Sequence, residues 1–175
     1  MDYLIVRKLG QGVVTTTQQE LEKIGPTANI RLHGDNVGGV EEIVGRTLDS
    51  AQGKPISLLI DLGDIAVDRY SAALLNVLST RMIGGVELPT GSNVVLVVDE
   101  HAFAEVSSAV LARTIVLNLA KAASMPSSES AGNPESLDKI RDHIKNAIRD
   151  LAMEVLLERR TKGGSESALE SPSLG

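Results

Sequence analysis

Residues 55–100, PISLLIDLGDIAVDRYSAALLNVLSTRMIGGVELPTGSNVVLVVDE, decide the fold of this chain. The stretch contains two apolar runs, at residues 56–60 and 94–98, and an aspartate follows each run. Continuous runs rich in Val, Ile and Leu are typical of strands buried on both faces, which belong to parallel sheets covered by helices. Ligand sites of such sheets lie at the carboxyl ends of the strands, so Asp61 and Asp99 are the first candidate site residues.

Working outward from this stretch, strand and helix patterns alternate along the chain. Strands are predicted at residues 3–6, 28–33, 56–60, 94–98 and 114–119. Helices are predicted between them at residues 15–24, 40–50, 67–78 and 101–111, the first of them capped by a Thr. Loops are expected at 7–14, 34–39 and 83–92, the last with a small hairpin at Gly84 and Gly85. This order predicts an α/β three-layer sandwich with a mostly parallel five-stranded sheet.

The rest of the chain suggests an appendage to one α/β domain at residues 1–122. Residues 123–134 have the Ser, Gly and Pro content of a linker, and residues 161–175 that of a disordered tail. Between them, residues 135–160 predict an amphipathic helix with a narrow apolar stripe. Such a helix either docks on its own domain or pairs with a partner helix, and the sequence leaves both alternatives open.

Composition restricts the classes of function. The net charge of −6 disfavours nucleic acid as a partner, since phosphate binding needs basic surfaces. The absence of Cys excludes disulfides, thiolate metal ligands and Cys nucleophiles. We expect a cytoplasmic protein without a membrane partner, because the chain has no apolar run of about 18 residues and no signal-peptide pattern.

A loop at residues 9–19, LGQGVVTTTQQ, stands where a phosphate-binding loop would follow the first strand. The motif of such loops ends in Gly-Lys-Ser/Thr, and Val14, Thr15 and Thr16 stand there instead. The Lys that reaches the β- and γ-phosphates is missing, although Thr16 could in principle hold Mg²⁺. We therefore interpret the segment as a plain strand-to-helix turn.

Three further candidates could each form a functional site or have only a structural role: Asp61, the run from Asp99 to His101, and Arg113. Asp61 fits a Mg²⁺-binding carboxylate, but Leu62 follows it where hydrolysis would need a second acid, so a loop hydrogen bond is the favoured interpretation. The Asp99, Glu100, His101 run, which His33 could join, is interpreted as a polar strand-to-helix turn rather than a metal or acid–base site. Arg113 could equally reach a neighbouring subunit's phosphate or form a surface ion pair.

The central segment resembles the MoxR-type AAA+ ATPases. The resemblance rests on Ala73-Leu74-Leu75, Arg81, Gly84, Leu88-Pro89, Gly91 and Val94-Val95, and Arg113 matches the family's conserved Arg before the last core strand. It covers residues 3–119 and implies a P-loop fold. The departures fall on the catalytic machinery: Val14 and Thr15 replace the loop's Gly and Lys, Leu62 the catalytic Glu, and Asp99 the sensor Asn.

A second segment, residues 30–75, is similar to a STAS (anti-anti-sigma) domain. That resemblance implies a mixed sheet and a regulatory module phosphorylated near Ser71, although the usual Asp-Ser-x-Gly neighbourhood is replaced by Asp68-Arg69-Tyr70-Ser71-Ala72. It ranks second.

The resulting hypothesis is a degenerate AAA+-like pseudo-ATPase that works by protein–protein contact or self-association through residues 135–160. It expects no catalytic residue, no metal site and no cofactor. A vestigial nucleotide site would comprise Gly12, Thr15, Thr16, Asp61, Asp99 and Arg113. The alternative is a nucleotide-binding ATPase with atypical motifs, which would bind ATP and Mg²⁺ at the same residues.

Overall fold

The computed structural model describes residues 1–8, 12–31, 39–63, 70–120 and 134–170, with side chains in the last range described for 138–161. Five strands form one sheet in the order β2-β3-β6-β1-β7, and every neighbouring pair is parallel. Their bounds are β1 (Tyr3–Arg7), β2 (Thr27–Arg31), β3 (Ser57–Gly63), β6 (Asn93–Asp99) and β7 (Ile115–Asn118). The predicted α/β architecture is confirmed.

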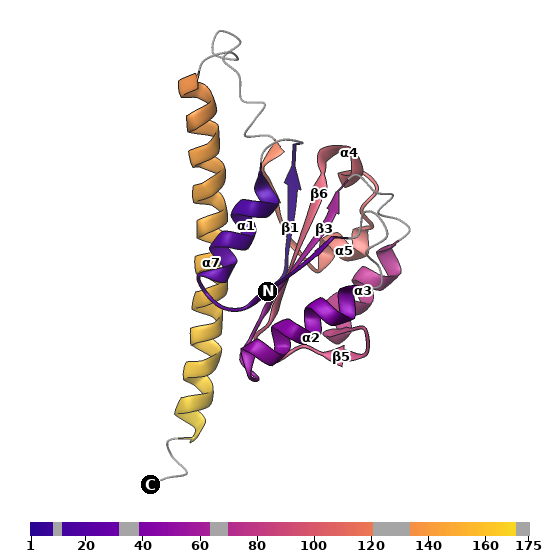
Figure 1. Ribbon diagram of the computed structural model, residues 1–175, viewed down its shortest axis with the longest axis vertical. Helices are drawn as coiled ribbons and strands as arrows, with labels where there is room; N and C mark the ends of the chain where they lie inside the picture. Colours follow the sequence, from indigo (N-terminus) through magenta and orange to yellow (C-terminus); the bar gives the residue numbers. More distant parts are fainter. Residues whose placement is uncertain (9–11, 32–38, 64–69, 121–133, 171–175) are drawn as a thin grey trace.

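Helices cover both faces of the sheet (Figure 1). One face is covered by α1 (Val13–Glu22) and α7 (Pro134–Glu170), the other by α2 (Val40–Ala51), α3 (Ser71–Thr80), α4 (Glu100–Phe103) and α5 (Ser108–Ala112). The predicted hairpin is present as β4 (Met82–Ile83) and β5 (Val86–Glu87), which pair antiparallel. The result is three layers, as the sequence predicted.

The two runs that decide the fold are the central strands β3 and β6, and all of their residues are buried. Successive side chains of a strand point to opposite faces. Leu58 and Ile60 therefore join the cluster under α2 and α3, whereas Leu59 joins the cluster under α1 and α7. A strand with apolar neighbours on both faces has no polar side, which explains the unbroken apolar runs in the sequence.

Helix α7 docks on its own domain. The predicted apolar stripe is buried in one cluster with the sheet and α1, through Ile144, Ile148, Leu151 and Val155. An ion pair also joins α7 to the start of the chain, because the amino group of Met1 contacts the Glu158 carboxylate at 2.9 Å. Of the two alternatives that the sequence left open, docking in cis is the one observed.

Some element bounds differ from the prediction. Helix α1 begins at Val13, with Gly12 in the left-handed conformation (φ 62°) as its N-cap, so the predicted Thr cap is wrong. The expected single helix at 101–111 is two short helices, α4 and α5. The second begins where Ser107 accepts a hydrogen bond from the backbone N–H of Val110 at 3.3 Å, which makes Ser107 the side-chain N-cap of α5.

Two further element bounds differ from the prediction. Strand β1 includes Arg7, which the sequence placed in a loop, and α7 continues beyond residue 160 to Glu170. The predicted linker and nearly all of the 34–39 loop lie outside the described residues. None of the described helices combines the length and the apolarity needed to cross a membrane.

Candidate functional site

A cluster of three charged side chains lies at the carboxyl edge of the sheet. Arg7 at the end of β1 donates from Nε to Oδ1 of Asp99 on β6 at 2.8 Å, and from Nη2 to Oδ1 of Asp61 on β3 at 3.1 Å. Strand β6 lies between β1 and β3, so the arginine spans all three strands. The structure therefore brings the two predicted aspartates together around a residue that the sequence interpretation did not include.

This cluster is largely removed from solvent. The side chain of Arg7 is 16% exposed, and those of Asp61 and Asp99 are 6% and 2% exposed. Asp61 also accepts the backbone N–H of Gly63 at 3.0 Å, where the strand pairing shifts by one residue. Ion pairs shielded from water are stronger than surface pairs, but only when each charge keeps its partner. Arg7 is thus the cation on which the two buried carboxylates depend.

The sequence contained a signal for Arg7 that the loop interpretation obscured. In a parallel sheet the ends of adjacent strands meet at one edge, and Arg7 follows an apolar run as Asp61 and Asp99 do. Two acids at buried strand ends need a positive charge nearby. Arg7 and Lys8 directly follow the first apolar run, so these two cations stand near that edge of the sheet.

Three other members of the predicted nucleotide site, Gly12, Thr15 and Thr16, lie at the start of α1. Gly12 precedes the helix and accepts the N–H of Thr16 at 3.1 Å, an ordinary first-turn bond. Thr15 is exposed, and Thr16 is partly buried. The side chain of Val14 is buried in the core between the sheet and α7. Residues 9–11 of the predicted loop lie outside the described residues.

Arg113 lies at the opposite end of the sheet from Asp61 and Asp99. It precedes β7, whose first residue, Ile115, pairs with Tyr3 near the start of β1. Its side chain is exposed and donates from Nη1 to the carbonyl of Ala109 on its own helix at 3.1 Å. Within one chain, Arg113 therefore does not join the Arg7 cluster.

The remaining candidates do not converge on a metal site. Asp99 is turned inward to Arg7, whereas Glu100 and His101 are exposed, and His33 lies outside the described residues. Across the described part of the chain, no group of three His, Asp or Glu side chains could hold a metal ion. Ser71 is the first residue of α3 and is partly buried.

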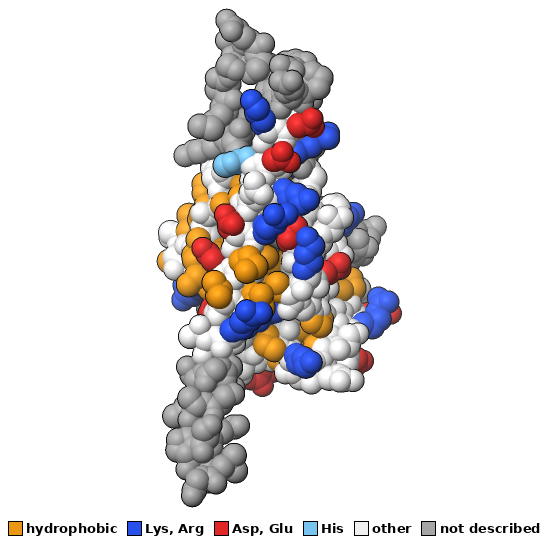
Figure 2. Space-filling model, turned by 90° about the vertical axis from the view of Figure 1, so that its left-hand side faces the viewer, with side chains coloured by type: hydrophobic (Ala, Val, Ile, Leu, Met, Phe, Trp, Pro, Cys, Tyr) orange, Lys and Arg blue, Asp and Glu red, His pale blue; other side chains and the backbone are white. Residues whose placement is uncertain are grey.

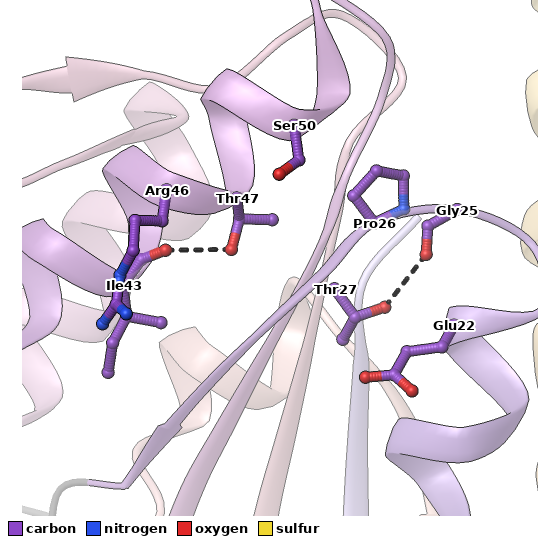
Figure 3. Close-up of a pocket in the computed structure, with 8 residues that line it drawn as sticks. All are labelled: Glu22, Gly25, Pro26, Thr27, Ile43, Arg46, Thr47 and Ser50. Atoms are coloured by element: carbon purple, nitrogen blue, oxygen red, sulfur yellow. Dashed lines mark hydrogen bonds between the residues drawn. The ribbon is translucent and has the colours of Figure 1, made fainter.

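A cavity of about 620 Å³ lies beside edge strand β2, between the end of α1 and helix α2 (Figure 3). Two of its hydroxyl groups donate to backbone carbonyls: Thr47 to that of Ile43 at 2.9 Å, and Thr27 to that of Gly25 at 3.4 Å. Arg46 lines the cavity and pairs with the exposed Glu42 at 3.8 Å. Figure 3 shows no nucleophile paired with a base, so this cavity offers no evident catalytic arrangement.

No protein-family model matches the chain, and no curated protein matches it significantly.

Proposed function

We propose that this chain is a non-hydrolytic, AAA+-like pseudo-ATPase that works through protein–protein contacts. The observation that carries the proposal is the position of Arg7 between Asp61 and Asp99, at 3.1 and 2.8 Å. P-loop enzymes use a strand-end carboxylate at this edge for Mg²⁺ and the nucleotide phosphates. Here the chain's own guanidinium binds the carboxylates, so a Mg²⁺ ion would have to displace it.

The sheet topology supports the first resemblance over the second. A P-loop sheet is parallel, with the aspartate strand beside the first strand or one removed from it; here β3 is separated from β1 by β6 alone. The STAS resemblance implies a mixed sheet, and all four observed pairings are parallel. No observation at Ser71 favours a phosphorylation switch over its place as the first residue of α3.

An exposed apolar surface supports the proposed role in contacts. It comprises Met1, Ile115, Met153 and Leu157, each between 43% and 55% exposed, and is called the β7–α7 surface below. The backbone N–H of Ile115 donates to the carbonyl of Asp2 at 2.9 Å, and Met1 contacts Glu158, the neighbour of Leu157. These bonds bring Met1, Ile115 and Leu157 to one edge of the molecule, and Met153 lies one helical turn before Leu157 on α7. Figure 2 shows hydrophobic side chains gathered on the face that carries α7.

The location of this surface favours a protein as the occupant. Strand β7 is the edge strand of the five-stranded sheet, and the outer side of an edge strand can pair with a strand of another chain. Exposed apolar patches beside such edges are typical of protein interaction sites. The partner side of α7 would then be the outer face with Met153 and Leu157, because the predicted stripe is already buried against the sheet.

One observation favours the alternative, a nucleotide-binding protein with atypical motifs: Asp61 and Asp99 do converge at the carboxyl edge. If Arg7 moved away, the two carboxylates could accept Mg²⁺. Titration of the full chain with Mg-ATP separates the two functions. The proposal predicts no binding at millimolar nucleotide and no hydrolysis, whereas the alternative predicts micromolar binding that Asp61→Ala removes.

A further inference from the structure

A second cavity, of about 610 Å³, lies at the amino ends of three strands, on the side of the sheet remote from Arg7. Its walls are the turns before β2, β3 and β6, at residues 25–26, 53–55 and 89–91, and the segment of α7 that contains Leu156, Arg159 and Arg160. In Figure 1 this region is the lower end of the sheet, beside the yellow part of α7. The volume is in the range of sites for small molecules.

The lining of this cavity is positively charged, in contrast to the net charge of −6 of the chain. Lys54, Arg159 and Arg160 line it, and none of the described lining residues is acidic. Lys54 and Arg160 are exposed, and neither forms an ion pair within the described part of the chain. Two cations that form no ion pair with a described residue therefore border the same cavity.

Arg159 is partly buried and is held by neutral acceptors. It donates from Nε to the carbonyl of Gly91 at 3.2 Å, and from Nη2 to Oγ of Ser57 at 3.2 Å and Oδ1 of Asn93 at 2.8 Å. Burial lowers the pKa of Arg159, because desolvation penalises its charge, and nearby Glu158 only partly opposes this effect. Both carboxylate oxygens of Glu158 bind the amino group of Met1.

One end of this guanidinium remains available. Nη1 of Arg159 donates to no acceptor among the described residues, and it lies 3.2 Å from the position that a Cβ on Gly25 would occupy. Gly25 is itself a lining residue of the cavity. The guanidinium is thus fixed in orientation by Ser57 and Asn93 and still has donors at the turn that borders the cavity.

We propose that this cavity binds a small molecule that carries a phosphate group. A phosphate would accept hydrogen bonds from Nη1 of Arg159 and place its charge beside Lys54 and Arg160. Of the glycines in the three turns, Gly53 has open space where a Cβ would lie, whereas that space at Gly25 and Gly91 is bordered by Arg159 and Pro55. The proposal is independent of the pseudo-ATPase function, since the Arg7 cluster lies at the other end of the strands.

The test is isothermal titration of the full chain with inorganic pyrophosphate, with matched charge-neutralising variants. We expect saturable binding of pyrophosphate to the wild type, weakened about tenfold by Arg160→Gln and by Lys54→Gln, since each removes one cation from the ligand. Arg149→Gln is the control, because Arg149 is an exposed arginine on α7 that does not line the cavity. It should leave the affinity unchanged.

Two results would overturn the proposal. One is the absence of binding at ten-millimolar-scale pyrophosphate, and the other is an equal loss of affinity in Arg149→Gln and Arg160→Gln, which would indicate general charge attraction. Both cavity variants alter exposed side chains, so circular dichroism should report an intact fold. An Asp61→Ala variant separates the two ends of the sheet: it should not change pyrophosphate binding, whatever it does to Mg-ATP.

Discussion

Arg7 and Asp99 are direct register partners on the adjacent parallel strands β1 and β6, and Nε of Arg7 lies 2.8 Å from Oδ1 of Asp99. The same guanidinium reaches past β6 to Asp61. One cation therefore joins the ends of three strands at the edge where α/β proteins usually bind their ligands. The guanidinium of Arg7 therefore supplies a positive charge to both acids at this edge.

The first prediction concerns the stability of this cluster. Arg7→Ala should destabilise the fold by about 3–5 kcal/mol, because it removes a cation that pairs with two buried carboxylates. Arg46→Ala is the matched control, since Arg46 forms an exposed pair with Glu42 at 3.8 Å, and such pairs contribute about 0–1 kcal/mol. Urea unfolding followed by circular dichroism measures both. Equal effects of the two substitutions would show that Arg7 carries no special structural role.

A second prediction tests the docking of α7 in cis. Ile148 is fully buried between α7 and the sheet, so Ile148→Ala should cost about 2–5 kcal/mol of unfolding free energy. Met153→Ala on the exposed side of the same helix should cost much less. If the helix docks on its own domain, the loss from Ile148→Ala should not depend on protein concentration. A loss that shrinks as the concentration rises would instead indicate pairing between chains.

The pH dependence of stability gives a third prediction, through Tyr3. Burial raises the pKa of Tyr3 above its usual value of 10.0, and the hydrogen bond to Glu154 at 3.0 Å adds to this effect. Above pH 10 the folded chain retains a proton that the unfolded chain loses, so stability falls as the pH rises. Tyr3→Phe cannot lose a proton there, and its unfolding free energy should decline less steeply between about pH 9 and pH 11. Parallel slopes for the two proteins would contradict this account.

The β7–α7 surface leads to a fourth prediction. We expect the chain to self-associate through this surface at high micromolar concentration, because an open edge strand can pair with its own copy. Leu157→Glu and Ile115→Glu should each keep the chain monomeric in sedimentation equilibrium. Met82→Glu is the control, since Met82 is 40% exposed but lies on hairpin strand β4 rather than on this surface. A wild type that is monomeric at all concentrations would exclude self-association as the contact.

The sequence was sufficient to predict the sheet because the decisive signals were long. The runs that became β3 and β6 are almost entirely apolar, with Ser57 as the exception, and this pattern has few interpretations besides a strand buried on both faces. The stripe on α7 was equally clear, but a stripe does not specify which surface covers it. Only the fold shows that the sheet and α1 supply that surface.

The candidate site was predicted only in part. Asp61 and Asp99 were recognised because they follow apolar runs, whereas Arg7 was assigned to a loop because Gly10 and Gly12 follow it closely. Arg113 was grouped with the aspartates by family resemblance, although in this chain it lies at the other end of β7. Arg159 carried no local signal at all, since its partners Ser57 and Asn93 are far from it in the sequence.

The most direct test of the central claim is a titration of the full chain with Mg-ATP, combined with an assay of phosphate release. Because Arg7 already binds Asp61 and Asp99, we predict no binding at millimolar nucleotide and no ATP hydrolysis. Arg7→Met serves as the companion variant, because it removes the guanidinium from both carboxylates while keeping an unbranched side chain. Micromolar binding of Mg-ATP by the wild type, or hydrolysis that Asp61→Ala abolishes, would contradict the account.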